Sequence, residues 1–90
     1  MTSPPVLVIV RTRDPHRQAE ALRAALGLTL RGSRVEVAIE TSGEVDAALA
    51  TPLARRAADT LRSFGHPVGA LSDDALAAAL ARAGRVEVWT

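Results

Sequence analysis

The amino-acid sequence predicts a three-layer α/β domain built on a four-stranded parallel sheet. Three observations support this fold class. Strand-like and helix-like patterns alternate along the chain as β-α-β-α-β-α-β. Each long helical segment begins with a capping residue followed by proline or aspartate, and each ends near a glycine. The length, 90 residues, fits a single domain covering 1–90. This alternation favours parallel strands joined by right-handed crossovers.

Four segments have the composition of strands. Residues 6–10 are continuously apolar and β-branched, which predicts a strand buried on both faces. Residues 67–71 are short and mostly apolar, so we place this strand inside the sheet as well. Residues 34–40 and 85–89 alternate apolar and polar side chains, which is typical of edge strands. These characters predict the spatial order 2-1-3-4, a short flavodoxin-like arrangement, with one helix on one face and two on the other.

Three helical segments separate the strands. The first begins at the Asp14 cap, runs to about Leu30 and ends at Gly32. A second, weaker at 44–50, restarts at Thr51 and ends at Gly65, and a third runs from Ser72 to Gly84. Spacings of three and four predict these buried stripes: Ala19, Leu22, Ala25, Leu26 and Thr29; Leu53, Ala57, Leu61 and Phe64; Leu76, Ala79, Leu80 and Ala83. Gly27, inside the first helix, predicts close packing on a neighbour.

Composition excludes several classes of function. The chain has 11 basic residues, all arginine, against 10 acidic ones, and its only aromatic residues are Phe64 and Trp89. This balance disfavours nucleic-acid binding, which needs clustered positive charge and stacking aromatics. There is no cysteine, and His16 and His66 lie far apart, so we expect no metal or other cofactor.

Location and assembly follow from the same features. The longest aliphatic run, five residues, is far below the ~20 needed to span a bilayer, so we expect no membrane association. No export signal precedes it, which predicts a cytoplasmic protein. A chain of this size buries only about 60–65% of its unfolded surface. Since disulfides and metals are not available to it, association with other chains is the expected source of added stability.

A ligand site in such a fold lies beyond the carboxyl ends of the strands, at the switch point. In the order 2-1-3-4 this point falls between the first and third strands. The candidate ligand-binding residues are Arg11, Thr12, Arg13, Asp14, His16, Thr41, Ser42 and Ser72, with Glu40, Glu44 and Asp73 nearby.

Each candidate has a structural alternative. Asp14 and Ser72 are explained as helix caps, and the arginines as solvated side chains. His16 is explained as an exposed residue at a helix start, and His66 as a structural residue in a turn. No glycine-rich phosphate loop and no G-x-S-x-G turn is present. The sequence therefore contains no recognisable catalytic constellation, and we expect no enzymatic activity.

Trp89 has two interpretations of equal weight. It is the only tryptophan and lies on an alternating strand. Tryptophan is enriched in the centres of protein interfaces, so this side chain could anchor a partner. Alternatively, it covers the last helix.

Two segments resemble the DsrE/DsrF/DsrH (TusBCD-like) superfamily. One is the helix, glycine turn and strand at 21–37, and the other is the capped helix followed by Arg-Val-Glu-Val-Trp at 85–89. Active members carry sulfur as a persulfide on a cysteine, and this chain has none. The resemblance therefore implies a non-catalytic scaffold or interaction protein of a sulfur relay, assembling as a homo-oligomer (dimer, trimer or hexamer) or with DsrE-like subunits. The alternative is a small-anion or nucleotide-binding module that uses the loop after the first strand.

Overall fold

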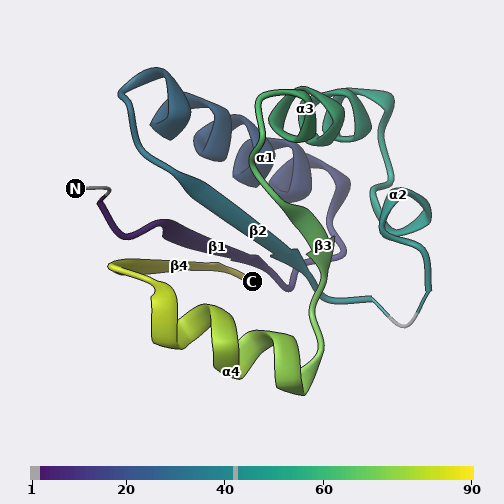
Figure 1. Ribbon diagram of the computed structural model, residues 1–90. Helices are drawn as coiled ribbons and strands as arrows, with labels where there is room; N and C mark the ends of the chain where they lie inside the picture. Colours follow the sequence, from purple (N-terminus) through teal and green to yellow (C-terminus); the bar gives the residue numbers. More distant parts are fainter. Residues whose placement is uncertain (1–2, 42) are drawn as a thin grey trace.

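The computed structural model describes residues 3–41 and 43–90, and it contains the predicted alternation of strands and helices (Figure 1). The strands are β1 (Val6–Val10), β2 (Val35–Ile39), β3 (Val68–Ala70) and β4 (Arg85–Trp89). The helices are α1 (Pro15–Leu30), α2 (Val45–Ala48), α3 (Pro52–Ser63) and α4 (Asp73–Arg82). The predicted interruption after residue 50 is confirmed, since α2 and α3 are separate helices.

The four strands form one parallel sheet in the order β3-β2-β1-β4. The predicted fold class, a three-layer α/β domain with a four-stranded parallel sheet, is confirmed. The predicted order 2-1-3-4 is wrong, because β2 rather than β3 lies beside β1, and β3 and β4 form the two edges. The switch point therefore falls between β1 and β4. The predicted order placed it between the first and third strands, which are not neighbours in the sheet.

An ion pair beneath the sheet explains the error. The alternating pattern of β2 predicts an edge strand with one solvent-exposed face, but the polar face of β2 is covered by α4. The Glu36 side chain is only 18% exposed and pairs with Arg82 of α4, at 3.0 Å between Oε2 and Nη2. Arg82 donates hydrogen bonds to the Glu36 carboxylate, and these bonds together with the negative charge of Glu36 raise the pKa of Arg82 above its usual value. The polar position of the β2 alternation is therefore a largely buried Glu36 paired with an arginine of α4.

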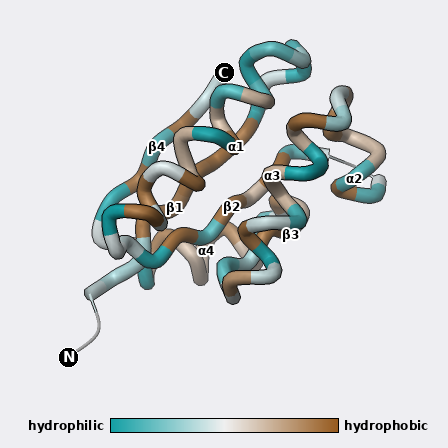
Figure 2. Tube along the Cα trace, turned by 90° about the horizontal axis from the view of Figure 1, so that it is seen from above, coloured by the Kyte–Doolittle hydropathy of each residue, from teal (hydrophilic) through white to brown (hydrophobic). Residues whose placement is uncertain are grey.

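The helices form a layer on each side of the sheet. Figure 1 shows α1 and α3 above the sheet and α4 below it. The upper layer holds the larger core, where Leu22 and Leu61 pack on Val8 and Val37. Viewed from above, hydrophobic positions concentrate along the central strands (Figure 2). The lower layer is thin, because Leu7, Ile9 and Ala79 are the buried members of its core cluster.

The predicted helix boundaries are confirmed at the caps. The side chains of Asp14, Thr51 and Ser72 each accept backbone N–H bonds at a helix start. Gly32 and Gly65 adopt φ of 87° and 85° directly after α1 and α3, a conformation that favours glycine.

Some predicted core positions are wrong. Leu53, Phe64 and Leu80 are 51%, 68% and 45% exposed, because small alanines rather than these large side chains face the sheet. Ala54 and Ala58 of α3 are buried in their place. The prediction that Gly27 marks close packing is also wrong, since a Cβ atom built there meets nothing within 4 Å.

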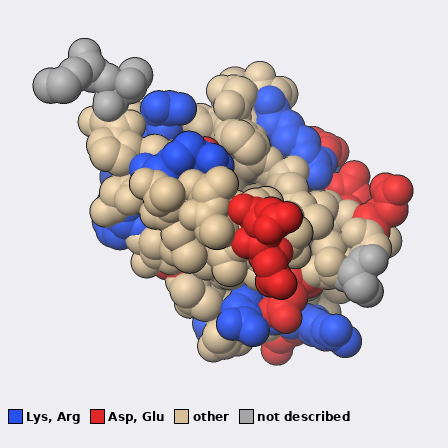
Figure 3. Space-filling model, turned by 60° about the horizontal axis from the view of Figure 1, so that its bottom comes forward, with Lys and Arg blue, Asp and Glu red and all other residues tan. Residues whose placement is uncertain are grey.

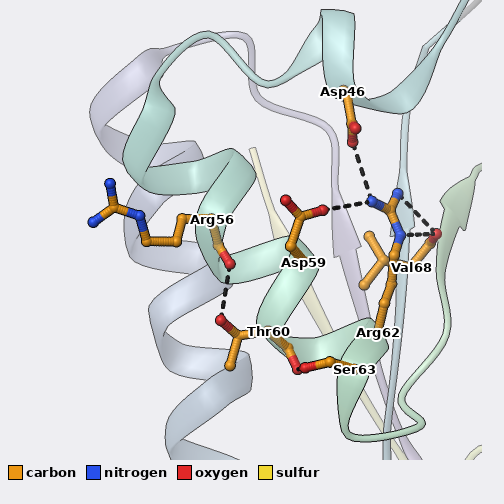
Figure 4. A network of polar contacts seen from close by, with 7 residues as sticks. All are labelled: Asp46, Arg56, Asp59, Thr60, Arg62, Ser63 and Val68. Carbon is orange, nitrogen blue, oxygen red and sulfur yellow. Dashed lines mark hydrogen bonds and ion pairs between the residues drawn. The ribbon is translucent and has the colours of Figure 1, made fainter.

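One arginine joins three elements at the β3 edge (Figure 4). The guanidinium of Arg62, on α3, lies 3.2 Å from Asp46 of α2 and 3.3 Å from Asp59 of its own helix. It also donates from Nε and Nη2 to the Val68 carbonyl, at 3.4 and 3.3 Å. Arg62 therefore fixes α2 and covers a carbonyl on the outer edge of β3.

Candidate functional site

The carboxyl edge of the sheet brings together the residues that follow β1 and β2. Arg11 Nε lies 2.8 Å from Glu40 Oε2, which joins the two loops. Beside this pair is a cavity of about 310 Å³, and its lining residues are Arg13, Gln18, Glu40, Thr41 and Ala48. The structure therefore brings four predicted candidates, Arg11, Arg13, Glu40 and Thr41, to one place.

The start of α1 is occupied by the chain itself. Asp14 Oδ1 accepts hydrogen bonds from the amides of His16 and Arg17, at 2.8 and 3.2 Å. The Thr12 hydroxyl accepts one from the Asp14 amide at 3.1 Å. The donors that attract anions to helix starts are thus used by the Asp14 carboxylate. Asp14 and Thr12 act here as capping residues.

Five further candidates lie away from this cavity or are not described. His16 is 81% exposed and pairs with Glu20 one turn along α1, at 2.6 Å. The Ser72 hydroxyl accepts from the Ala75 amide at 3.3 Å, beyond the edge strand β3 and separated from β1 by β2. Asp73 lies in the first turn of the same helix, and Glu44 is the N-cap residue of α2. Ser42 lies outside the described residues.

Gln18 is the residue that sequence reasoning missed. It is 3% exposed and is the only buried polar residue among those the structure describes. Its Nε2 donates to the carbonyls of Thr12 and Ala48, at 3.2 and 2.9 Å, and its Oε1 accepts from the Ala50 amide at 3.0 Å. The side chain thus joins the loop after β1 to the segment that follows α2, beside the cavity. The available signal was an amide next to Ala19 and four residues before Leu22, on the predicted buried face of the helix.

The switch point between β1 and β4 is crossed by backbone hydrogen bonds and by contacts of one arginine. The Trp89 carbonyl accepts from the amides of Arg11 and Thr12, at 2.8 and 3.1 Å. The guanidinium carbon of Arg17 lies 5.3 Å from the centre of the Trp89 ring, within cation–π range. Arg17 Nε also donates to the Thr90 carbonyl at 2.8 Å.

The position of Trp89 removes one of its two interpretations. Its ring packs partly buried against the core beneath α1, on the opposite face of the sheet from α4. The interpretation that it covers the last helix is therefore wrong. A role in an interface stays a prediction.

The cavity offers a mixed polar surface. Arg13 supplies donors, Thr41 a hydroxyl, and Glu40 a carboxylate already engaged by Arg11. Such a set suits hydrogen bonding to a small polar molecule better than neutralising a strong anion. Across residues 3–41 and 43–90, no three His, Asp or Glu side chains are grouped so that they could hold a metal ion. Within the same ranges no helix is both long and apolar enough to cross a bilayer.

His66 has the structural role predicted for it. Its Nδ1 accepts a hydrogen bond from the Val35 amide at 3.3 Å, and its own amide donates to the Leu61 carbonyl at 2.9 Å. The side chain therefore joins the end of α3 to the start of β2.

Comparisons with known proteins gave no match to a family model, to a curated protein or to a solved structure.

Proposed function

We propose that this chain is a non-catalytic assembly subunit, whose function is to associate with a second copy or with related DsrE-like subunits. The observation that carries the proposal is the apolar surface on the α4 side of the sheet. Leu80 is 45% exposed, Val86 41% and Val88 53%. α4 buries only Ala79 completely, so one helix covers this face thinly. Exposed apolar side chains grouped on one face are typical of interaction sites.

Charge on this side of the molecule is compatible with association. Figure 3, which brings the lower side forward, shows uncharged surface among separate acidic and basic groups. No single sign of charge dominates that view, so two such surfaces do not repel each other strongly. The sulfur-relay setting is supported by the resemblance to DsrE-like proteins. Since this chain has no cysteine, a partner subunit would have to carry the persulfide.

The alternative, a small-anion or nucleotide-binding module, has less support. Arg11 is neutralised by Glu40, and Asp14 uses the amides at the start of α1. We therefore expect phosphate-bearing ligands to leave the melting temperature unchanged. If a nucleotide raised it and Arg11→Ala abolished the increase, the alternative would replace the assembly proposal.

Light scattering coupled to gel filtration tests the proposed function. The parent chain should elute as an oligomer at micromolar concentration. A double variant, Leu80→Gln with Val88→Thr, removes apolar surface from the α4 side and should raise the Kd about tenfold or more. Leu30→Gln is the matched control, because Leu30 is 87% exposed at the far end of α1. A parent chain that stays monomeric across the concentration range, alone and with a DsrE-like subunit, would contradict the proposal.

A further inference from the structure

The outer edge of β4 presents backbone groups that are free to pair. The Arg11 amide donates to the Trp89 carbonyl, which fixes the ladder between β1 and β4. Backbone groups in a parallel ladder alternate in direction along a strand. Those of Arg85, Glu87 and Trp89 therefore face β1, and those of Val86 and Val88 face outward. In the part of the chain that the structure describes, β1 is the only strand beside β4.

The other edge of the sheet is protected. β3 has three residues against five in β4. The outward carbonyl of Val68 already accepts hydrogen bonds from Arg62. Short length and a side chain placed over the edge are two ways in which proteins prevent edge pairing. Neither is present at β4, so β4 is the edge available to another chain.

The side chains of β4 make this edge complementary to itself. Arg85 and Glu87 are two apart, so they lie on one face of the strand, and within the chain they pair with each other. In an antiparallel pair with Val86 opposite itself, Arg85 of each copy faces Glu87 of the other. Moving the centre to Glu87 places two carboxylates opposite each other, which is destabilising. Charge thus favours the register centred on Val86.

We propose that β4 pairs with β4 of a second copy, antiparallel, with Val86 on the two-fold axis. The outward amide and carbonyl of Val86 then bond to those of its counterpart. The two charged pairs occupy neighbouring positions without backbone bonds, where facing side chains are closest. Each four-stranded sheet continues into the other, and the exposed valines of the two copies meet on the α4 side. This interface rests on the proposed function, because it names how the subunit associates.

Charge reversal tests the pairing. Arg85→Glu makes both positions acidic and Glu87→Arg makes both basic, so each variant alone should dimerise about tenfold or more weakly than the parent. Mixing the two variants restores opposite charges across the interface, although the pair within each chain stays broken. The mixture should therefore form a heterodimer of near-parental Kd, measured by analytical ultracentrifugation. Arg56→Glu, a reversal of an exposed arginine on α3, is the control and should leave the Kd unchanged.

Cysteine crosslinking tests the register. The chain has no cysteine, so an introduced one is the only thiol in each copy. Directly opposite residues with backbone bonds have Cα atoms about 5.5 Å apart, within the range of a disulfide. Val86→Cys should therefore crosslink into a covalent dimer under mild oxidation. Glu87→Cys should crosslink much more slowly, and Leu30→Cys, at the exposed end of α1, serves as the control for random collision.

The outcomes separate this inference from the proposed function. A parent chain without any association would overturn both. An oligomer that survives both charge reversals, or that crosslinks no faster through Val86→Cys than through Leu30→Cys, overturns the β4 interface and leaves the assembly proposal standing. Heterodimer formation together with selective crosslinking at Val86 supports the interface and its register.

Discussion

Gln18 shows how one buried amide can organise a loop region. Three backbone groups, from Thr12, Ala48 and Ala50, have this side chain as a hydrogen-bond partner. An unsatisfied buried polar group costs about 1–3 kcal/mol. We therefore expect Gln18→Leu to lower the free energy of unfolding by about 2–4 kcal/mol in urea denaturation. Gln18→Glu keeps the acceptor but places a buried carboxylate against the carbonyls of Thr12 and Ala48, so it should destabilise at least as much as Gln18→Leu. A change below about 0.5 kcal/mol, the range of a neutral surface substitution, would contradict this role.

Substitution of Gly27 is expected to stabilise the fold, whereas substitution of Gln18 destabilises it. A glycine within a helix costs about 0.8–1.0 kcal/mol relative to alanine. Because a Cβ atom at this position meets nothing within 4 Å, the alanine variant gains helix propensity without a clash. Gly27→Ala should raise the free energy of unfolding by about 0.5–1 kcal/mol. Gly32→Ala is the matched comparison, and it should destabilise, because Gly32 has φ of 87°. Equal effects of the two substitutions would refute the distinction.

At single positions, the sequence allowed the capping residues to be predicted and the core residues only in part. Caps are local, since Asp14 and Ser72 act on amides two or three residues away. Gln18 was missed because two of its three partners lie on a segment about thirty residues along the chain, and only the fold brings them near. Leu53 and Phe64 were placed in the core because their spacing is helical, but α3 turns its alanines toward α1 and the sheet.

Of the two long helices that follow β2, α4 is held less firmly than α3. It buries only Ala79, and a mainly apolar hollow of about 140 Å³ separates part of it from β2 and β3. By contrast, α3 buries Ala54, Ala57, Ala58 and Leu61. Regions with little buried apolar surface open at lower free energy than the core.

Native-state hydrogen exchange should therefore separate the two helices. Amides in the middle of α4 should exchange faster than those in the middle of α3, at equal pH and temperature. Association through β4 should slow the exchange of the outward Val86 and Val88 amides as concentration rises. Equal protection of α3 and α4 at low protein concentration would contradict the view that α4 is weakly held.

The order of the strands could not be predicted from their individual patterns. β2 carries Glu36 and β3 carries none of the charged residues, which favoured β3 for the interior. The decisive contact is between Glu36 and Arg82, which lie 46 residues apart. Local patterns predict which segments are strands, because periodicity is a property of each segment. Their arrangement depends on contacts between segments, which periodicity does not contain.

For the whole molecule, the corrected order also moved the candidate site. Arg11, Arg13, Glu40 and Thr41 still meet, because β1 and β2 are neighbours in both orders. Ser72 was separated from them, because β3 lies beyond β2. The two edges differ in a way that the sequence did not indicate, since Arg62 protects β3 and leaves β4 open. That asymmetry points to one preferred direction in which the sheet can extend.

The position of β4 beside β1 also affects how the chain is made. β1 is the most apolar strand, and β4 covers one of its edges. During synthesis, β2 and β3 can join the sheet first. The edge of β1 that pairs with β4 stays unpaired until the residues of β4 emerge from the ribosome. An exposed apolar strand edge is prone to aggregation. The nascent chain is therefore most dependent on chaperones in the interval between the synthesis of β1 and that of β4.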